Sequence, residues 1–247
     1  MRVWMPLPDS DFDTTEVAIP WKTLREAGHE VVFATEHGGG APACDPKLID
    51  GVIFGKLGAK PPAIAAYREL ERAPEFQAPV AWGQIDPAAF DGIVLPGGHA
   101  PGMRQYLGSE ELQRKVAEFW ALERPVGAIC HGVLVLARAG VLGASRTTCL
   151  PKSMERGAHL LTSWKLGRYY RTYPAYVQDE VVAALDDPKQ FEVGPVATYS
   201  RPWVVEDGRY VSARWPGDAQ LFAERFAARL SAGLRPQPAA VTPPRAT

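Results

Sequence analysis

Short apolar runs and helical stripes alternate along the chain, and this pattern predicts an α/β fold. The runs at Val3–Met5, Glu30–Thr35 and Ile93–Leu95 are typical of buried strands, because almost no polar residue interrupts them. Between the first two runs, apolar residues recur at spacings of three and four, which predicts a helix that ends at Gly28. A strand, a helix and a second strand in this order indicate a parallel βαβ unit.

The same alternation continues in the second half of the chain. Ser109 is a good helix cap ahead of an amphipathic stretch, and Val126–Cys130 is a fully apolar strand. The residues from His131 to Ala139 predict a helix, and a further strand is expected near Thr147–Leu150. Asp207-Gly208 lies between two apolar pairs and predicts a β-hairpin turn. The chain therefore predicts a three-layer α/β sandwich.

Two segments depart from this alternation. Residues 157–187 are predicted to be helical and carry many aromatic side chains, yet they are too few for an independent core. We interpret them as a helical cap inserted into a single domain that spans residues 1–230. Residues 231–247 contain several prolines and almost no large apolar side chain, so they predict a disordered tail.

Composition narrows the function classes. The 27 Lys and Arg residues nearly balance the 28 Asp and Glu residues, which argues against a dedicated nucleic-acid binder or an electrostatic membrane anchor. No apolar stretch approaches the roughly 20 residues that a membrane-spanning helix needs. The 3 cysteines are too few and too scattered for a disulfide framework or a CxxC zinc site. We therefore expect a soluble cytoplasmic protein.

The segment Ala128–Gly132 carries the clearest chemical signal. A buried strand, a cysteine at a sharp turn and a following helix are the parts of a nucleophile elbow. The start of a helix lowers the pKa of a thiol, so Cys130 is the predicted nucleophile and the predicted fast-reacting thiol. The alternative is an inert buried cysteine, which is how we interpret Cys44 and Cys149.

A glycine-rich turn follows the strand that ends at Leu95. Gly97, Gly98 and His99 bring backbone N–H groups that can approach a ligand closely, because no Cβ intervenes at the glycines. Together with the N–H of His131 they are candidate donors for an oxyanion hole. A glycine pair after a strand is also compatible with an ordinary tight turn.

Glu16 has two possible roles. It lies three residues after Asp13 at a helix start, as in a capping box, or it points across the strand ends at the thiol. The remaining histidines show no ligand-like spacing with carboxylates or cysteines, and we predict no metal site; these are His29, His37 and His159.

Three segments together resemble the ThiJ/PfpI superfamily, a branch of the class I glutamine amidotransferase-like fold. They are Asp13-Thr-Thr-Glu16, Leu95-Pro-Gly-Gly-His99 and Ala128-Ile-Cys-His-Gly132. Within the superfamily the chain is most similar to the larger heat-shock glyoxalase III/chaperone branch. The resemblance implies a flavodoxin-like three-layer sandwich with a mainly parallel sheet and a helical cap insertion.

The resemblance also implies roles for individual residues. His131 is the expected base, and Glu155, which follows the next predicted strand, is the candidate acid that orients it. Glu16 matches the carboxylate that hydrogen-bonds the thiol in the family. The downstream His-Glu pair of the true amidotransferases has no counterpart here beyond His159, which argues against glutamine hydrolysis. The segments 100–104 and 157–187 differ from the glyoxalase members, and both would line the mouth of the pocket.

The function implied by the resemblance is a cofactor-independent reaction of small 2-oxoaldehydes, of the glyoxalase III, D-lactate dehydratase or deglycase type. In this reaction Cys130 adds to the aldehyde carbon. The family also implies a stress-response role and a homodimer. Two alternatives stay open: a thiol hydrolase or isonitrile hydratase that uses the same cysteine, and a stress chaperone or redox sensor.

Overall fold

Seven strands form the central sheet in the order β5–β3–β1–β6–β7–β9–β8. The structure is a computed structural model that describes residues 1–171 and 173–232. Every neighbouring pair in this sheet is parallel except β8 with β9, which confirms the predicted mainly parallel α/β fold. The strands are β1 (Arg2–Pro6), β3 (Glu30–Thr35), β5 (Val80–Ala81), β6 (Gly92–Leu95), β7 (Val126–Ile129), β8 (Val204–Asp207) and β9 (Tyr210–Ala213). Two short strands, β2 (Ser10–Phe12) and β4 (Ala43–Cys44), pair outside this sheet.

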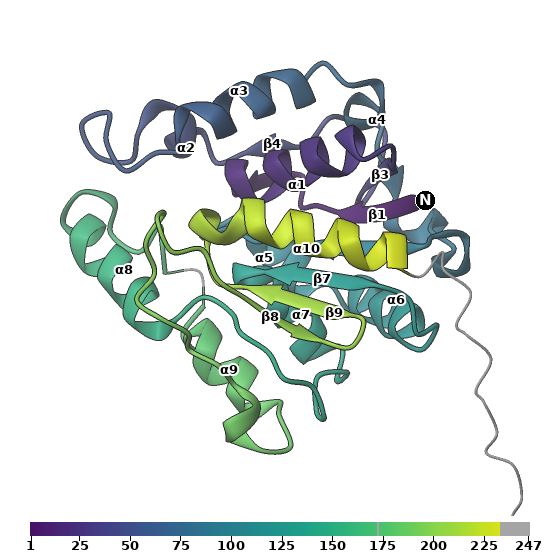
Figure 1. Cartoon of the computed structure of the whole chain (residues 1–247). Helices are drawn as coiled ribbons and strands as arrows, with labels where there is room; N and C mark the ends of the chain where they lie inside the picture. Colours follow the sequence, from purple (N-terminus) through teal and green to yellow (C-terminus); the bar gives the residue numbers. More distant parts are fainter. Residues whose placement is uncertain (172, 233–247) are drawn as a thin grey trace, which may run out of the picture.

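Helices cover both faces of the sheet, as the alternating pattern predicted. On one face α1 packs against α3 and α10, and on the other face α7 packs against α5, α6 and α9. Figure 1 shows α1 and α10 in front of the sheet and α7 behind it. The helices are α1 (Thr14–Glu26), α2 (Pro46–Asp50), α3 (Pro61–Leu70), α4 (Pro74–Gln77), α5 (Met103–Gly108), α6 (Glu110–Trp120), α7 (Val133–Arg138), α8 (Lys152–Leu166), α9 (Val177–Ala183) and α10 (Ala219–Ala232).

Asp13 sets the start of α1. Its side chain accepts hydrogen bonds from the backbone N–H groups of Thr15 (2.8 Å) and Glu16 (3.0 Å). In a capping box the N–H of Asp13 would donate to the carboxyl of Glu16. Here it donates to the carbonyl of Gly97 instead, at 2.9 Å. Pro20 lies inside α1, which continues through it to Glu26. The Glu16 side chain is therefore available for another contact.

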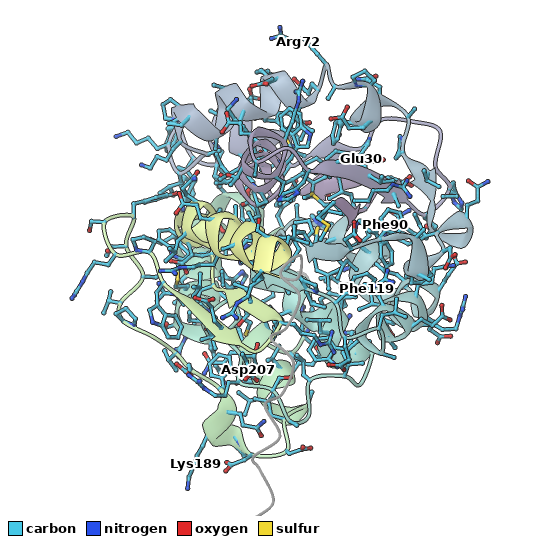
Figure 2. All side chains as sticks on the ribbon, turned by 45° about the vertical axis from the view of Figure 1, so that its right-hand side comes forward. Glu30, Arg72, Phe90, Phe119, Lys189 and Asp207 are labelled. Carbon is cyan, nitrogen blue, oxygen red and sulfur yellow. The ribbon has the colours of Figure 1, made fainter. Side chains whose placement is uncertain are left out.

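The apolar runs seen in the sequence form the core around the sheet. Figure 2 shows Phe90 and Phe119 within the body of the molecule, whereas Arg72 and Lys189 project from its edge. Large side chains fill the space between sheet and helices, among them the fully buried Trp4 and Trp21. Among the described residues, none of the helices has the length and apolar character needed to cross a membrane.

Two expectations from the sequence need correction or qualification. Residues 147–150 form no strand: Thr147 makes one isolated parallel bridge to Phe191. The physical reason is that the backbone N–H of Thr148 donates to the hydroxyl of Ser212 at 3.0 Å instead of to a strand backbone, so the pairing does not continue. The segment 157–187 contains α9 and most of α8, but α8 begins earlier, at Lys152. Of the predicted tail, residues 231–232 belong to α10, and the rest lies outside the described residues.

Gly132 offers a test of how closely the elbow is packed. A Cβ at this position would lie 2.1 Å from the carbonyl oxygen of Leu95, which is backbone and cannot move aside cheaply. We expect Gly132→Ala to lower the free energy of unfolding by about 1–3 kcal/mol, as overpacking does elsewhere. Denaturant unfolding measures the change. Gly157→Ala is the control: it lies in α8, nothing lies within 4 Å of an added Cβ, and no loss of stability is expected.

Candidate active site

The carboxyl ends of three neighbouring strands bring the predicted site residues together. The strands β1, β6 and β7 are adjacent in the sheet, and ligand sites of open parallel sheets form at this edge. The segment after β1 supplies Asp13 and Glu16, the turn after β6 supplies Gly97 to His99, and the turn after β7 supplies Cys130 and His131. Motifs that are far apart in the sequence thus meet at one place.

Cys130 occupies the predicted sharp turn between β7 and the following helical turns. Its backbone φ is 58°, in the left-handed region that residues with a Cβ rarely adopt. The turn is packed tightly on both sides. An added Cβ at Gly97 would lie 2.7 Å from the backbone nitrogen of His131, so only glycine permits this approach. The elbow predicted from the sequence is present in the structure.

His131 lies beside the thiol as a neutral imidazole. Its Nδ1 is 3.5 Å from Sγ of Cys130, and its ring meets the ring of His99 edge-on at 4.5 Å between centroids. Burial lowers the pKa of His131 well below its ordinary value, and the neighbouring His99 lowers it further. Burial also lowers the pKa of His99, to about 4. A neutral His131 at this distance is able to accept the thiol proton.

Glu16 faces the thiol and the glycine turn. Its Oε2 accepts a hydrogen bond from the backbone N–H of Gly97 at 3.0 Å, and its carboxyl interacts with the thiol of Cys130. Burial raises the pKa of Glu16 well above its ordinary value, and the negative charge of Asp13 raises it further. Burial therefore favours the protonated form of this carboxyl. Of the two roles left open by the sequence, the structure places Glu16 in the one directed at the thiol.

The expected low pKa of the Cys130 thiol is wrong. Burial raises the pKa of Cys130 well above its ordinary value, and the charges of Glu16 and Asp13 add to this increase. The backbone N–H of His131 hydrogen-bonds the sulfur and acts in the opposite direction, but it does not dominate. The side chain is only 1% exposed. The resting group is a thiol that needs a base when it reacts.

Asp13 is a second buried acid at the site. Burial raises its pKa from 3.8 to about 6, although its hydrogen bonds from Glu16 and Thr15 act in the opposite direction. From the sequence, Asp13 is expected only to cap a helix. Its influence on Glu16 and Cys130 depends on burial and proximity, which no local sequence signal reveals.

The residues of the glycine turn make different contacts at the site. The N–H of Gly97 is already bound to Glu16, so Gly97 positions that carboxyl. The N–H groups of Gly98 and His131 stay the candidate oxyanion donors. His99 contributes a buried ring that touches both His131 and Tyr170, the latter with ring centroids 6.0 Å apart.

The structure does not bring Glu155 to His131. One oxygen of the Glu155 carboxylate accepts a hydrogen bond from Arg171 and the other from the N–H of Val177, both at 2.9 Å. In the part of the chain that the structure describes, no carboxylate hydrogen-bonds to His131. The predicted Cys130–His131–Glu155 triad is therefore not formed, because α8 begins at Lys152 and Glu155 binds the segment that connects α8 with α9.

Three potential ligand atoms for a metal lie close together at the site. They belong to His99, Cys130 and His131 and are all within 4.8 Å of one another. Sequence spacing did not show this group, because His99 joins the other two only through the fold. The absence of a metal remains a prediction.

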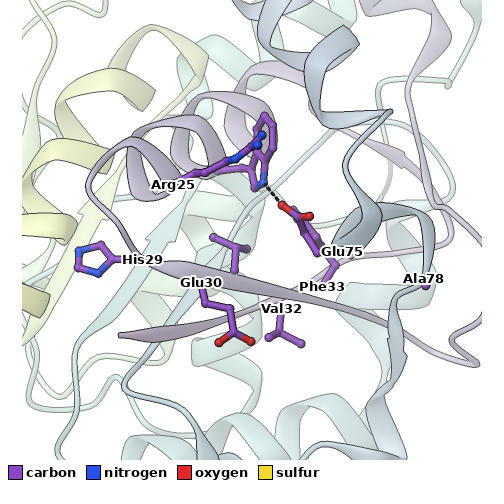
Figure 3. Close-up of a pocket in the computed structure, with 9 residues that line it drawn as sticks. Arg25, His29, Glu30, Val32, Phe33, Glu75 and Ala78 are labelled. Carbon is purple, nitrogen blue, oxygen red and sulfur yellow. Dashed lines mark hydrogen bonds between the residues drawn. The ribbon is translucent and has the colours of Figure 1, made fainter.

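Two cavities mark places where a ligand fits. One, of about 400 Å³, adjoins the site through Asp13, Thr15 and His99. The other, of about 290 Å³, lies along β3 and is shown in Figure 3 with Arg25, His29 and Glu30 at its wall. In this second cavity a hydrogen bond of 3.1 Å joins Trp21 to Glu75. Its lining shares no residue with the elbow or the glycine turn, whereas the first cavity includes His99, so the first cavity is the candidate substrate site.

Comparisons with known proteins agree with this geometry. A family model described as ThiJ/PfpI family-like matches residues 7–195, and the chain belongs to this family. A curated relative, a deglycase of Pyrococcus abyssi, is 28% identical over 227 residues, which are 92% of this chain and 97% of the relative. The deglycase PfpI of Pyrococcus furiosus is 26% identical over 221 residues, with coverage of 89% and 94%.

The solved structures show the same fold. The crystal structure of glyoxalase III from Candida albicans has a TM-score of 0.63 and 17% identity, and the match covers 93% of this chain and 97% of that one. A rapid encystment protein of Francisella tularensis has a TM-score of 0.69 and 17% identity, with coverage of 93% and 98%. These likenesses support the fold predicted from the sequence motifs.

The charge of Asp13 can be tested by removing it. Asp13→Asn keeps an oxygen that caps α1, but removes the charge that raises the pKa values of Cys130 and Glu16. We expect the rate of Cys130 alkylation by iodoacetamide to rise at a lower pH in the variant than in the wild type. If the midpoint pH of Cys130 alkylation in Asp13→Asn were equal to or higher than that of the wild type, this account would be contradicted.

Protein stability provides the matching control. Because the folded-state pKa of Asp13 lies at about 6, above its ordinary value of 3.8, the folded state holds this proton more tightly. The stability that the protonated Asp13 contributes is lost as the pH rises through about 6. Between about pH 4 and about pH 6, urea unfolding should therefore show a larger loss of stability for the wild type than for Asp13→Asn.

Proposed function

We propose that this protein is a cysteine-dependent, cofactor-independent enzyme that converts 2-oxoaldehydes into 2-hydroxy acids. The observation that carries the proposal is the 3.5 Å approach of His131 Nδ1 to Sγ of Cys130, with the buried carboxyl of Glu16 beside the same thiol. A nucleophile, a base and an acid are thus present in one water-poor site. The deglycase names of the two archaeal relatives support carbonyl chemistry of this kind.

The first step is addition of the thiol. His131 accepts the proton of Cys130 while the sulfur forms a bond to the aldehyde carbon, and the carbonyl π electrons move to its oxygen. The backbone N–H groups of Gly98 and His131 stabilise the oxygen as charge develops on it. Return of the proton from His131 to this oxygen gives a neutral hemithioacetal.

The second step moves hydrogen between the two substrate carbons. His131 removes the proton from the former aldehyde carbon, while Glu16 protonates the neighbouring ketone oxygen, and an enediol results. The hydroxyl on the sulfur-bearing carbon then loses its proton as the second carbon gains one, which gives a thioester. Water attacks the thioester, the C–S bond breaks and the sulfur regains a proton. The sum is addition of one water molecule, and no external oxidant or reductant is consumed.

Removal of the nucleophile tests the proposal against its rivals. We expect Cys130→Ala to lose turnover of methylglyoxal and to stay folded, whereas Cys44→Ala keeps turnover because Cys44 lies outside the site. The same pair should be assayed with small amides and isonitriles. Activity of the wild type on these compounds and none on aldehydes would favour the hydrolase or hydratase alternative.

Glu16→Gln tests the acid. The amide oxygen can still accept the Gly97 N–H, so the fold and melting temperature should be kept, but the proton donor is lost. We expect kcat/KM for methylglyoxal to fall roughly 10²–10⁴-fold, the usual contribution of a general acid or base. A folded variant with wild-type activity would leave His131 as the only proton-transfer group.

Glu155→Gln is the contrasting variant. It removes the charge of a carboxylate that is 2% exposed and ion-paired with Arg171. We expect a lower melting temperature, since the partly buried Arg171 loses its charged partner, and a much smaller loss of kcat/KM than for Glu16→Gln. A stable Glu155→Gln protein with the larger loss of activity would restore Glu155 to the catalytic group.

A further inference from the structure

We propose that the cavity beside the site binds an uncharged apolar group of the substrate, so that the preferred 2-oxoaldehydes carry an aryl or a bulky alkyl group. This inference rests on the proposed function and goes beyond it by naming the class of side group. It is carried by the position, the size and the lining of the cavity.

The cavity lies between the segment 48–59 and α8. The segment contributes Leu48, Val52 and Leu57, and α8 contributes Met154 and Leu161. Figure 1 shows α2 and α8 on the same side of the molecule. Aromatic side chains complete the wall; they are Tyr170, Tyr199 and Trp215. Apolar and aromatic side chains therefore dominate the surface that a ligand would touch.

The cavity ends one side chain away from the nucleophile. His99 lines it, and the same His99 lies with Cys130 and His131 in a group whose ligand atoms are within 4.8 Å of one another. Cys130 is almost fully buried and is not itself part of the lining. A substrate whose carbonyl carbon reaches Sγ past His99 therefore places its side group in the cavity.

The volume is too large for the smallest oxoaldehydes. About 400 Å³ accommodates on the order of ten water-sized groups at roughly 30 Å³ each. Methylglyoxal would leave most of this apolar space without contacts, whereas a phenyl ring or a longer alkyl chain would fill it. Burial of such a group is favourable, because it removes apolar surface from water.

The charges at the wall disfavour ionic substrates. Among the described residues, Asp13 is the single lining residue with an ionisable acid, and no lysine or arginine lines the cavity. A substrate with a phosphate or carboxylate group would lose its hydration here without gaining a cationic partner. Sugar phosphates and glycated acidic compounds therefore fit less well than neutral aryl compounds.

Tyrosines fix the wall that faces His99. The hydroxyl of Tyr170 donates to one oxygen of the buried Asp45 at 2.8 Å, and the hydroxyl of Tyr169 donates to the other at 3.1 Å. Asp45 also caps α2, whose Lys47 lies over the ring of Tyr169. The two walls of the cavity are thus joined beside the site, so that its shape is largely set before a ligand binds.

Gly157 allows the cavity to be filled without disturbing the fold. It lies in α8, lines the cavity, and an added Cβ would meet nothing within 4 Å. Leucine is also a better helix former than glycine. Gly157→Leu should therefore remain folded while it occupies part of the space. Ser153→Leu is the matched control, because Ser153 is exposed on the same helix and does not line the cavity.

The experiment compares kcat/KM for phenylglyoxal and methylglyoxal in the wild type and both variants. We expect the wild type to prefer phenylglyoxal by roughly ten- to a hundredfold, as burial of an aromatic group predicts. Gly157→Leu should lose most of this preference, and Ser153→Leu should keep it. A wild type that prefers methylglyoxal, or a Gly157→Leu variant with unchanged preference, would overturn the inference while the proposed function stands.

A binding measurement separates the two proposals if turnover is absent. Acetophenone presents the same aryl group without the aldehyde, and calorimetry or tryptophan fluorescence can follow its binding. Binding to the wild type and its loss in Gly157→Leu would support the apolar site even if no oxoaldehyde is converted, in which case only the proposed reaction fails. No binding of acetophenone to the wild type would overturn the assignment of the cavity.

Discussion

The left-handed backbone of Cys130 is the constraint on which the site depends. A φ of 58° at a residue with a Cβ persists only where the surroundings hold it, and here β7, Gly97 and Gly132 do so. This turn brings the thiol to the end of the sheet and sets Nδ1 of His131 within 3.5 Å of the sulfur. The close approach of Gly97 also places its N–H on Glu16. The thiol, the imidazole and the carboxyl are therefore positioned by one backbone feature and the packing around it.

Burial then determines how protons are distributed. The site holds the thiol, the carboxyls of Glu16 and Asp13 and the imidazole of His131, and burial favours the neutral form of each. This preference for neutral forms suits neutral aldehydes. It also explains why a helix start does not by itself make Cys130 a thiolate: loss of hydration outweighs the favourable backbone N–H of His131.

A buried ion pair supports the far wall of the site. Arg214 and Asp218 are both fully buried, and Nε of Arg214 donates to Asp218 at 2.8 Å. Between them in the chain, Trp215 and Pro216 line the cavity. Breaking such a pair would leave an uncompensated buried charge, so this segment is held firmly next to the elbow.

Local sequence signals predicted those parts of the molecule that local physics determines. Apolar runs gave the strands β3, β6 and β7, Asp13 and Ser109 gave helix starts, and Ala128–Gly132 gave the elbow. The expected strand near Thr147 was wrong, because strand pairing depends on distant partners, and here the N–H of Thr148 binds the side chain of Ser212.

Within the site, the motif predicted Glu16 as a functional residue. It did not determine which group the carboxyl contacts, because the same residues are compatible with a capping box and with a contact to the thiol. The predicted contact of Glu155 with His131 is absent, because the resemblance places an acid in the sequence without the fold that turns it toward Arg171. The side chains that surround the cavity come from seven separate parts of the chain, and no local pattern connects them.

The central claim is that Cys130 forms a covalent bond with the carbonyl substrate during turnover. Mass spectrometry of the acid-quenched protein after brief mixing with an excess of methylglyoxal tests it most directly. The account predicts a mass increase that corresponds to one substrate molecule, located by peptide mapping at Cys130 and absent in Cys130→Ala. Turnover by Cys130→Ala at the wild-type rate, or an adduct found only at other residues, would contradict it.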